Sequence, residues 1–302
     1  MRLKYVLGMA LAALMVMPSC KKPATQQDEQ TQVSAKKDIC VQLYSVRDLL
    51  KDYPIDSLLP KLAEMGYTSV EAAGYNDKDG TFYGKTPEEF KKLVEANGMA
   101  VLSFHVSHNL TDEELKKGDF TLEMDWWKAV VAAHKAAGMK YIADPWIGPQ
   151  KSIKDLQLYC DYLNAIGKLC ADNGIKFGYH NHNYEFEKVE DLVMYDYMLT
   201  HTDPNYVFFE MDVYWVMRGA ASPVAYFKQY PGRFKLLHIK DEAELGQSGM
   251  VGFDAIFNNV KTAGAEGIVV EVERYNMPVL ESVMESINYL KNAPFVPASY
   301  QN

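Results

Sequence analysis

From Asp38 onwards, the sequence alternates eight times between a short apolar segment and a longer amphipathic one. The apolar segments have the length and the β-branched and aromatic content of buried strands. They lie at residues 39–44, 68–73, 99–105, 139–144, 175–180, 206–211, 234–239 and 267–272. Helix-like segments such as PIDSLLPKLAEMG follow them, and glycines suited to helix caps stand in the joints before the next strand, at Gly66, Gly98, Gly138, Gly174 and Gly267.

Eight strand–helix pairs in one stretch predict an α/β fold, a single closed (β/α)8 barrel within residues 38–302. A doubly wound open sheet would use the same elements, but it gives no reason for the count to stop at eight. The apolar content of 48% suits such a core, and we expect no second domain. The net charge of −9 argues against binding nucleic acid, or an anionic membrane, through a basic face.

The first residues, 1–20, read MRLKYVLGMALAALMVMPSC and are not expected to join the barrel. A basic start and an apolar run too short to span a bilayer comfortably are typical of an export signal. The ending resembles a bacterial lipoprotein signal, in which Cys20 becomes the lipidated N-terminus; an ordinary secretory signal with a chance cysteine is the alternative. Residues 21–37 are polar, as in a flexible tether. We therefore expect an exported, periplasmic protein that meets the membrane only through a lipid anchor.

Polar and aromatic side chains gather where the predicted strands end. In a (β/α)8 barrel the chemistry takes place at that end, in the loops that follow the strands. Chance would not place so many ionisable groups at one end, so we predict an active site there. The residues are Gln42, Tyr44, Glu71, His105, His108, Asp144, Trp146, His180, His182, Glu210, Asp212, His238, Lys240, Glu271 and Glu273.

The last three predicted strands each carry two ionisable residues, spaced two positions apart. The alternation of a strand sends both members of such a pair to the same face. Carboxylates and imidazoles that converge from four neighbouring strands predict a divalent-metal site. The pairs, with the histidine of the preceding strand, are Glu210 and Asp212, His238 and Lys240, Glu271 and Glu273, and His180.

These segments resemble the sugar phosphate isomerase/epimerase family, whose members are xylose-isomerase-like TIM barrels, over residues 38–292. The family's aspartate followed closely by tryptophan matches Asp212 and Trp215. Its H-[IL]-K-D motif matches HIKD, which begins at His238, and its V-E-x-[DE] motif matches VEVE, which contains Glu271. In members with this pattern, the aspartate, the histidine and the first glutamate bind the metal. The resemblance therefore assigns Asp212, His238 and Glu271 to the metal.

The segment YHNHNYEF, residues 179–186, departs from the family pattern. Many relatives end this strand with a glutamate that is both a metal ligand and a proton-transfer base, often within E-N-H. Here His180 takes the glutamate's position and is expected to be the fourth ligand; a hydrogen-bonding role, or ligation by Glu185 instead, is the alternative. His182 matches the family's histidine and is expected to bind substrate or support a ligand. The second imidazole moves the expected metal from Mg²⁺ toward Mn²⁺, Co²⁺ or Zn²⁺.

Four further residues at the strand ends have two interpretations each. Glu71 and His105 match family positions that contact substrate hydroxyls, but a buried pair that braces the barrel mouth would use the same residue types. Trp146 and Trp215 are expected either to stack on a sugar ring or to pack against the apolar wall. The sequence alone leaves both interpretations open.

The chemistry that this set of residues predicts is proton transfer at a carbon next to a carbonyl group. A divalent ion would stabilise the charge that develops on oxygen. Glu271 or Glu273 would move the proton as a base, and Lys240 or His182 would supply the acid. A salt bridge from Lys240 to Asp241 or Glu273 is the alternative for that lysine.

Resemblance and expected export together predict an isomerase/epimerase-like enzyme for a non-phosphorylated sugar or keto sugar, because phosphorylated sugars are mainly cytoplasmic. The missing glutamate gives weight to a second reaction, a dehydratase or lyase that eliminates water or an alkoxide from a keto sugar or keto-glycoside. A non-catalytic sugar-binding lipoprotein is the third alternative, which turnover would exclude. No nucleic-acid partner is expected, and the sequence names neither the substrate, nor the metal, nor the oligomeric state.

Overall fold

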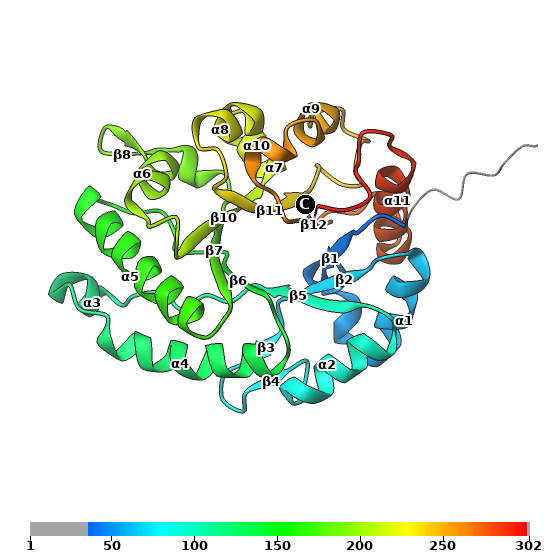
Figure 1. Cartoon of the computed structure of the whole chain (residues 1–302), viewed down its shortest axis with the longest axis horizontal. Helices are drawn as coiled ribbons and strands as arrows, with labels where there is room; N and C mark the ends of the chain where they lie inside the picture. The colour runs from blue at the N-terminus through cyan, green and yellow to red at the C-terminus, as the bar shows by residue number, and fades with distance from the viewer. Residues whose placement is uncertain (1–35, 301–302) are drawn as a thin grey trace, which may run out of the picture. The chain divides into compact units, whose positions relative to one another are not determined.

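The computed structural model describes residues 36–300, shown in Figure 1. The predicted signal segment with Cys20, and the predicted tether up to residue 35, lie outside the described residues. Within residues 36–300, none of the helices combines the length and apolar character that crossing a bilayer requires.

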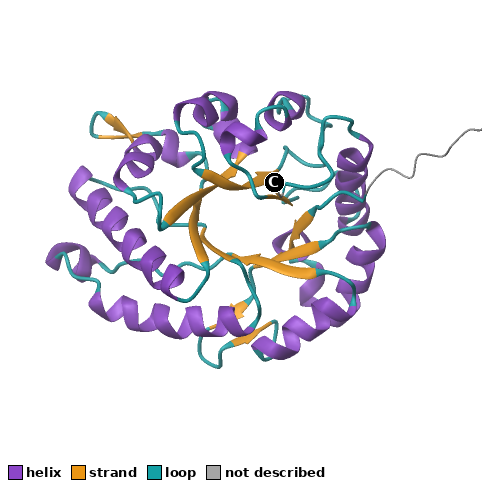
Figure 2. Cartoon of the chain, in the orientation of Figure 1, coloured by secondary structure: helices purple, strands orange, loops and turns teal. Residues whose placement is uncertain are grey.

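Eight parallel strands form the central sheet, and each matches one of the eight predicted strands. Their order around the sheet is β5-β2-β1-β12-β11-β10-β7-β6, and a parallel bridge between His105 and Ala143 joins β5 to β6. The predicted (β/α)8 barrel is therefore confirmed, and Figure 2 shows its strands at the centre of the helices. The strands are β1 (Cys40–Gln42), β2 (Ser69–Ala72), β5 (Ala100–Phe104), β6 (Tyr141–Asp144), β7 (Lys176–His180), β10 (Val207–Asp212), β11 (Phe234–Ile239) and β12 (Gly267–Val270).

Helices follow the barrel strands and cover their outer face (Figure 2). They are α1 (Ile55–Met65), α2 (Pro87–Ala96), α3 (Asp112–Lys117), α4 (Thr121–Ala136), α5 (Ile153–Asp172), α6 (Met194–His201), α7 (Val213–Arg218), α8 (Pro223–Gln229), α9 (Phe253–Phe257), α10 (Val260–Ala263) and α11 (Val279–Asn292). Short 3-10 helices are η1 (Leu43–Val46), η2 (Leu49–Lys51) and η3 (Tyr184–Phe186), and two small hairpins are β3 (Tyr75–Asn76) with β4 (Thr81–Phe82) and β8 (Lys188–Val189) with β9 (Leu192–Val193).

Glycines end several helices, as predicted, with one correction. The four that adopt the expected positive φ are Gly66, Gly98, Gly138 and Gly174. The fifth, Gly267, is instead the first residue of β12, and Gly264 closes α10 with a φ of +80°. A Cβ at Gly264 would lie 2.7 Å from the Cα of Gly232, so both the backbone conformation and the space require glycine there.

A register shift in β10 aligns the polar strand ends. Phe209 pairs with Phe234, but the next residue, Glu210, pairs with Leu236, so one residue of β11 is skipped. As a result Asp212 stands opposite His238. Paired residues of neighbouring strands point to the same side of the sheet, so this irregularity brings both side chains to the inside of the barrel.

His134 is a buried histidine in the layer between the helices and the barrel. Its Nδ1 donates a hydrogen bond to the Val130 carbonyl at 2.6 Å, and its ring lies 4.7–5.0 Å from those of Tyr75, Phe82 and Phe104. Burial lowers the pKa of His134 to about 4, against the small opposing effect of its bond to the Val130 carbonyl. The imidazole is therefore neutral in the folded protein at neutral pH.

This depressed pKa predicts a pH dependence of stability. The unfolded chain binds a proton at His134 near the ordinary pKa of 6.5, whereas the folded chain resists it until about pH 4. The free energy of unfolding should therefore fall as the pH drops through this window, by about 2 kcal/mol between pH 7 and pH 5. Urea unfolding of wild type and His134→Leu at both pH values measures the difference; equal pH dependence in the two proteins would contradict it.

Candidate metal centre

The four predicted metal ligands come together at the ends of four neighbouring strands. His180 ends β7, Asp212 ends β10, His238 lies near the end of β11, and Glu271 directly follows β12. One ligand atom from each lies within 4.8 Å of the others, and all four residues are buried. The His180 Nε2 is 3.6 Å from the Asp212 Oδ2, and the His238 Nδ1 is 3.5 Å from the Glu271 Oε2. The geometry is that of a pocket for one small cation.

Three of these inward atoms have no hydrogen-bond partner within the described part of the chain. They are the His180 Nε2, the Asp212 Oδ2 and the His238 Nδ1. Buried polar atoms are nearly always paired, because an unpaired one loses its hydration without compensation. Two imidazole nitrogens and two carboxylate oxygens form a donor set that suits Zn²⁺, Mn²⁺ or Co²⁺. The residues present therefore fit a divalent metal ion.

Asp212 is held in place by the start of the next helix. Its Oδ1 accepts a hydrogen bond from the Trp215 backbone N–H at 2.9 Å, so the aspartate caps α7. Its backbone N–H donates to the Asn181 Oδ1 at 3.1 Å, which ties the ends of β10 and β7 together. The cap uses one carboxylate oxygen and leaves Oδ2 free for a cation, which explains the spacing between Asp212 and Trp215.

Glu71 holds the ring of His238. The His238 Nε2 donates to the Glu71 Oε1 at 2.6 Å, and the same oxygen accepts from the Gln42 Nε2 at 2.8 Å. The other oxygen of Glu71 accepts from the Ser103 hydroxyl, and the side chain is fully buried. A carboxylate on one ring nitrogen orients the ring and directs the other nitrogen toward a metal. Against the lowering effect of burial, the charges of Glu210 and Glu71 raise the pKa of His238 well above its ordinary value, so a metal would displace the proton from Nδ1. The structure thus favours the bracing interpretation of Glu71 over substrate contact.

His105 and Glu210 extend this bracing layer. The His105 Nε2 lies 2.6 Å from the Glu210 Oε2 and 3.1 Å from the Glu71 Oε1. Burial and the charge of Glu71 raise the pKa of Glu210 to about 7. These contacts favour the bracing interpretation of His105 over substrate contact. The sequence grouped Glu210 with Asp212 at the predicted metal site, but in the structure Glu210 pairs with His105.

Burial and neighbouring charges set the protonation of the ligand cluster. Burial alone would raise the pKa of Glu271, but the positive charges of Lys240 and His238 outweigh it and hold that pKa well below its ordinary value. Burial raises the pKa of Asp212 to about 7, against the pull of the same two cations. Burial also lowers the pKa of His180 far below its ordinary value. Neutral imidazole is the form that binds metals, so His180 is ready to act as a ligand.

Glu185, the alternative to His180, is occupied elsewhere. Its Oε1 accepts from the Tyr179 hydroxyl at 2.7 Å, and its Oε2 accepts from the His182 backbone N–H at 2.9 Å. The cluster of potential ligands that contains Asp212 includes His180 and does not include Glu185. The geometry therefore favours His180 over Glu185 as the candidate fourth ligand.

Lys240 reaches two carboxylates at the edge of the cluster. Its Nζ lies 3.0 Å from the Glu271 Oε2 and forms a closer ion pair with Glu273, and it stands 5.0 Å from the centre of the Trp215 ring. Of the two expected salt-bridge partners, Glu273 is found. Asp241 is not the partner, because its carboxylate accepts hydrogen bonds from the loop that follows β11, including the Gly246 N–H at 3.0 Å.

Aromatic rings stand beside the cluster. His182 lies 5.3 Å from Trp146 and 5.6 Å from Trp215, measured between ring centres, and Tyr184 lies 4.8 Å from Trp146. Trp146 is 44% exposed, so its ring can contact a ligand as well as the wall. Tyr184 was not assigned a role from the sequence; its place in YHNHNYEF, two residues after His182, is the signal that could have found it.

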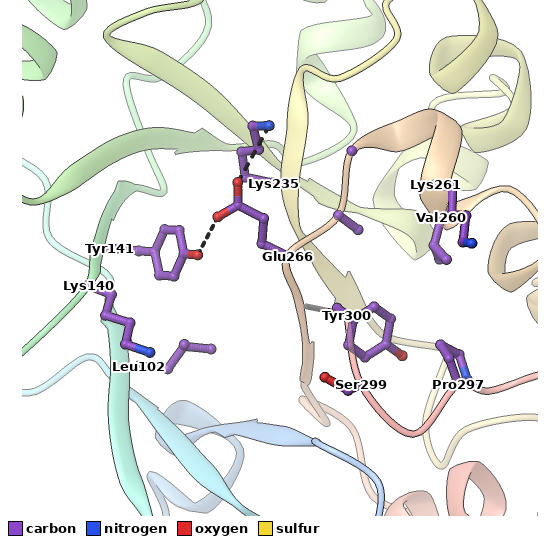
Figure 3. Close-up of a pocket in the computed structure, with 12 residues that line it drawn as sticks. Leu102, Lys140, Tyr141, Lys235, Val260, Lys261, Glu266, Pro297, Ser299 and Tyr300 are labelled. Atoms are coloured by element: carbon purple, nitrogen blue, oxygen red, sulfur yellow. Dashed lines mark hydrogen bonds and ion pairs between the residues drawn. The ribbon is translucent and has the colours of Figure 1, made fainter. Parts of the chain in front are cut away.

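A cavity of about 820 Å³ lies at the other end of the barrel (Figure 3). It is lined by residues that begin strands, among them Tyr141 and Lys235, which both point to Glu266. None of the predicted site residues lines it. Barrel chemistry occurs at the carboxyl ends of the strands, so this cavity is separate from the candidate metal centre.

The family described as "Xylose isomerase-like TIM barrel" matches residues 59–293. The chain belongs to this family. This match confirms the predicted fold class and, together with the relatives described next, confirms the predicted enzyme class at the level of a sugar-processing enzyme family.

Three known proteins show the range of relatives. A sugar phosphate isomerase/epimerase from Parabacteroides distasonis, a solved structure, is 33% identical, with 90% of this chain and 99% of that chain covered and a TM-score of 0.80. The inosose dehydratase of Clostridium beijerinckii is 26% identical over 205 residues, which cover 64% of this chain and 65% of that protein, just under two thirds. The protein IOLI, solved with a bound zinc atom, is 16% identical with a TM-score of 0.65 over 83% of this chain and 95% of that chain, and shares the fold.

The cluster predicts stoichiometric metal binding that depends on His180 and Asp212. We expect wild type to bind about one divalent ion per chain, and His180→Ala and Asp212→Ala to lose most of it, because each removes a ligand atom. Glu185→Gln is the matched control and should keep the metal. Metal content after dialysis, with circular dichroism to verify folding, measures the outcome; loss in Glu185→Gln alone would reassign the fourth ligand.

The Glu71–His238 hydrogen bond predicts a smaller loss of metal affinity than the removal of a ligand does, because Glu71 acts only through the ring of His238. Glu71→Gln should lower metal affinity by about 10- to 100-fold, because the ring nitrogen loses a charged acceptor that orients it. Competition with a chelator of known affinity measures the change. Ser103→Ala removes another partner of Glu71 and should lower the affinity less; an unchanged affinity in Glu71→Gln would contradict the orienting role.

Proposed function

We propose that this protein is a divalent-metal-dependent enzyme that moves a proton at the carbon next to a carbonyl group of a non-phosphorylated sugar or keto sugar. The observation that carries the proposal is the set of buried ligand atoms without partners beside a lysine and a carboxylate at the barrel mouth. His180, Asp212, His238 and Glu271 would hold the metal. When bound, the metal would act as a Lewis acid that polarises the carbonyl group.

Glu273 is the better of the two candidate bases. Glu271 is buried and committed to the cluster, with its pKa held far down by Lys240 and His238 despite its burial. The Glu273 side chain is 28% exposed and lies beside the ammonium of Lys240. It can take a proton from a substrate carbon and return it, while Lys240 donates a hydrogen bond to the oxygen that gains negative charge.

Lys240 is the better of the two candidate acids. Burial lowers the pKa of His182 to about 4, so this imidazole is neutral at pH 7 and has no extra proton to give. Its ring lies 5.3 Å from that of Trp146 and 5.6 Å from that of Trp215. It would instead contact the substrate, with Trp146 stacking on a sugar face. Lys240 remains as the positively charged donor at the mouth.

The overall reaction has two candidates. Epimerisation at one carbon is simplest with a base on each side of the substrate, and His180 stands where a second carboxylate would serve. A single carboxylate beside an ammonium suits β-elimination. Glu273 would take the proton from carbon, the hydroxyl on the neighbouring carbon would take a proton from Lys240 and leave as water, and Glu273 would then return its proton to Lys240. The dehydratase names of the curated relatives support this lyase reading. Aldose–ketose isomerisation, which also needs only one base, is the other candidate.

We also propose that the protein is exported and anchored in the periplasm through Cys20, which the N-terminal sequence supports. Export is the reason to expect a free sugar or keto-glycoside as the substrate, and a small molecule is the only partner proposed. The non-catalytic sugar-binding alternative stays as an outcome of the test below.

The proposed roles predict solvent exchange that depends on Glu273. In D₂O, metal-loaded wild type should place deuterium at the α-carbon of a keto sugar. Glu273→Gln, assayed with enough added metal to fill its site, should slow this exchange by about 10²- to 10⁴-fold. Glu242→Gln is the control, a carboxylate two residues after Lys240 that is paired with Arg274.

The products separate the alternatives. An unsaturated product would establish a lyase, and a ketose or epimer would establish an isomerase. A sugar that binds tightly without exchange or product would leave only the sugar-binding protein. Mass spectrometry and NMR of the recovered sugar measure all three.

A further inference from the structure

The ammonium of Lys240 shares a carboxylate oxygen with the candidate metal centre. Its Nζ lies 3.0 Å from the Glu271 Oε2. The same oxygen lies 3.5 Å from the His238 Nδ1, on the inner side of the cluster. Lys240 is buried, with only 2% of its surface exposed, so its ammonium group cannot reach solvent unless the side chain moves. A cation bound between His238 and Glu271 would therefore meet a fixed positive charge.

We propose that Lys240 is a built-in competitor for the metal and that Glu273 is the acceptor that relieves this competition. In this arrangement the ammonium neutralises Glu271 when the site holds no metal. When a divalent ion takes the Glu271 oxygen, Lys240 is held by Glu273 alone. The inference rests on the proposed metal centre and goes beyond it, because it concerns what sets the affinity of that centre.

The charges around the cluster support this role. A divalent ion and an ammonium repel each other strongly at short range in a buried site, where water screens little. Buried carboxylates need a positive partner, so without Lys240 the empty cluster would hold Glu271 beside Asp212 with less compensation. Lys240 therefore stabilises the metal-free protein and weakens metal binding, two effects of one contact.

Two features allow the ammonium to leave Glu271 without leaving the site. The Glu273 side chain, 28% exposed, already pairs with Nζ, whereas the Glu271 side chain is 6% exposed. The Trp215 ring centre lies 5.0 Å from Nζ, within reach of a cation–π interaction. Both of these groups, Glu273 and Trp215, lie at the mouth of the barrel. Metal binding and the presentation of Lys240 to substrate are therefore linked, and linkage of this kind is reciprocal.

The test measures metal affinity by calorimetry, with Mn²⁺ and Zn²⁺ as probes and a chelator as competitor, on the full chain. Lys240→Met should bind the metal about 5- to 150-fold more tightly than wild type, the usual range for coupling between sites. Glu273→Gln should bind more weakly, because the ammonium then stays on Glu271. Adding Glu273→Gln to Lys240→Met should change the metal affinity by less than about twofold, because this double variant has no ammonium for Glu273 to hold.

Lys235→Met is the matched control, since Lys235 lies at the other end of the same strand and pairs with Glu266. It should keep wild-type affinity. Thermal unfolding gives a second readout: metal-free Lys240→Met should melt below metal-free wild type, and metal should raise its melting temperature by more than it raises that of wild type.

The outcomes separate the two proposals. Wild type that binds no metal would defeat the proposed function. If wild type binds metal and Lys240→Met binds it no more tightly, only the proposed competition between Lys240 and the metal is overturned. Should Lys240→Met fail to fold, Glu273→Gln decides alone: weaker binding supports the competition, and equal or tighter binding refutes it.

Discussion

Closure of eight parallel strands is the constraint on which the site depends. It turns alternate side chains of every strand into one narrow space, where an ionisable group keeps its charge only beside a partner of opposite sign. Glu71 meets this condition within the protein, because its carboxylate accepts hydrogen bonds from His238, Gln42 and Ser103. The Asp212 Oδ2 and the His238 Nδ1 lie 3.9 Å apart and have no hydrogen-bond partner among residues 36–300. These two atoms are therefore open to a cation, whereas the atoms of Glu71 are already paired.

The strands and the four ligand residues were predictable because both depend on local patterns. A buried strand is visible as a short apolar run, and two ionisable residues at a spacing of two must share a face. The strand ends then converge once the barrel closes, which brings Asp212, His238 and Glu271 to one end of the barrel. The fourth position was predictable from the register of YHNHNYEF, but the choice between His180 and Glu185 needed the hydrogen bond from Tyr179.

The supporting contacts were not predictable, because they depend on register shifts that no local pattern reveals. Between Val70 and Glu71 the pairing of β2 with β5 skips a residue, which places Ser103 opposite Glu71. A matching shift before Glu210 brings Asp212 level with His238. Each shift arises from packing between strands far apart in sequence. Glu71 therefore looked equally suited to a substrate contact, and only its three hydrogen bonds favour the bracing interpretation.

The charge of Lys240 offers a physical reason why position 180 carries a histidine, where the family pattern has a carboxylate. With His180 neutral, three carboxylates surround the candidate metal centre, those of Asp212, Glu271 and Glu273. In the proposed site His238 would be neutral as a ligand, and three negative charges would balance one divalent ion and one ammonium. The metal and Lys240 could then be present together without excess charge of either sign. A glutamate at position 180 would add a fourth negative charge and tighten the hold on the metal. The imidazole therefore suits the proposed site, in which a lysine stays near the substrate at the expense of metal affinity.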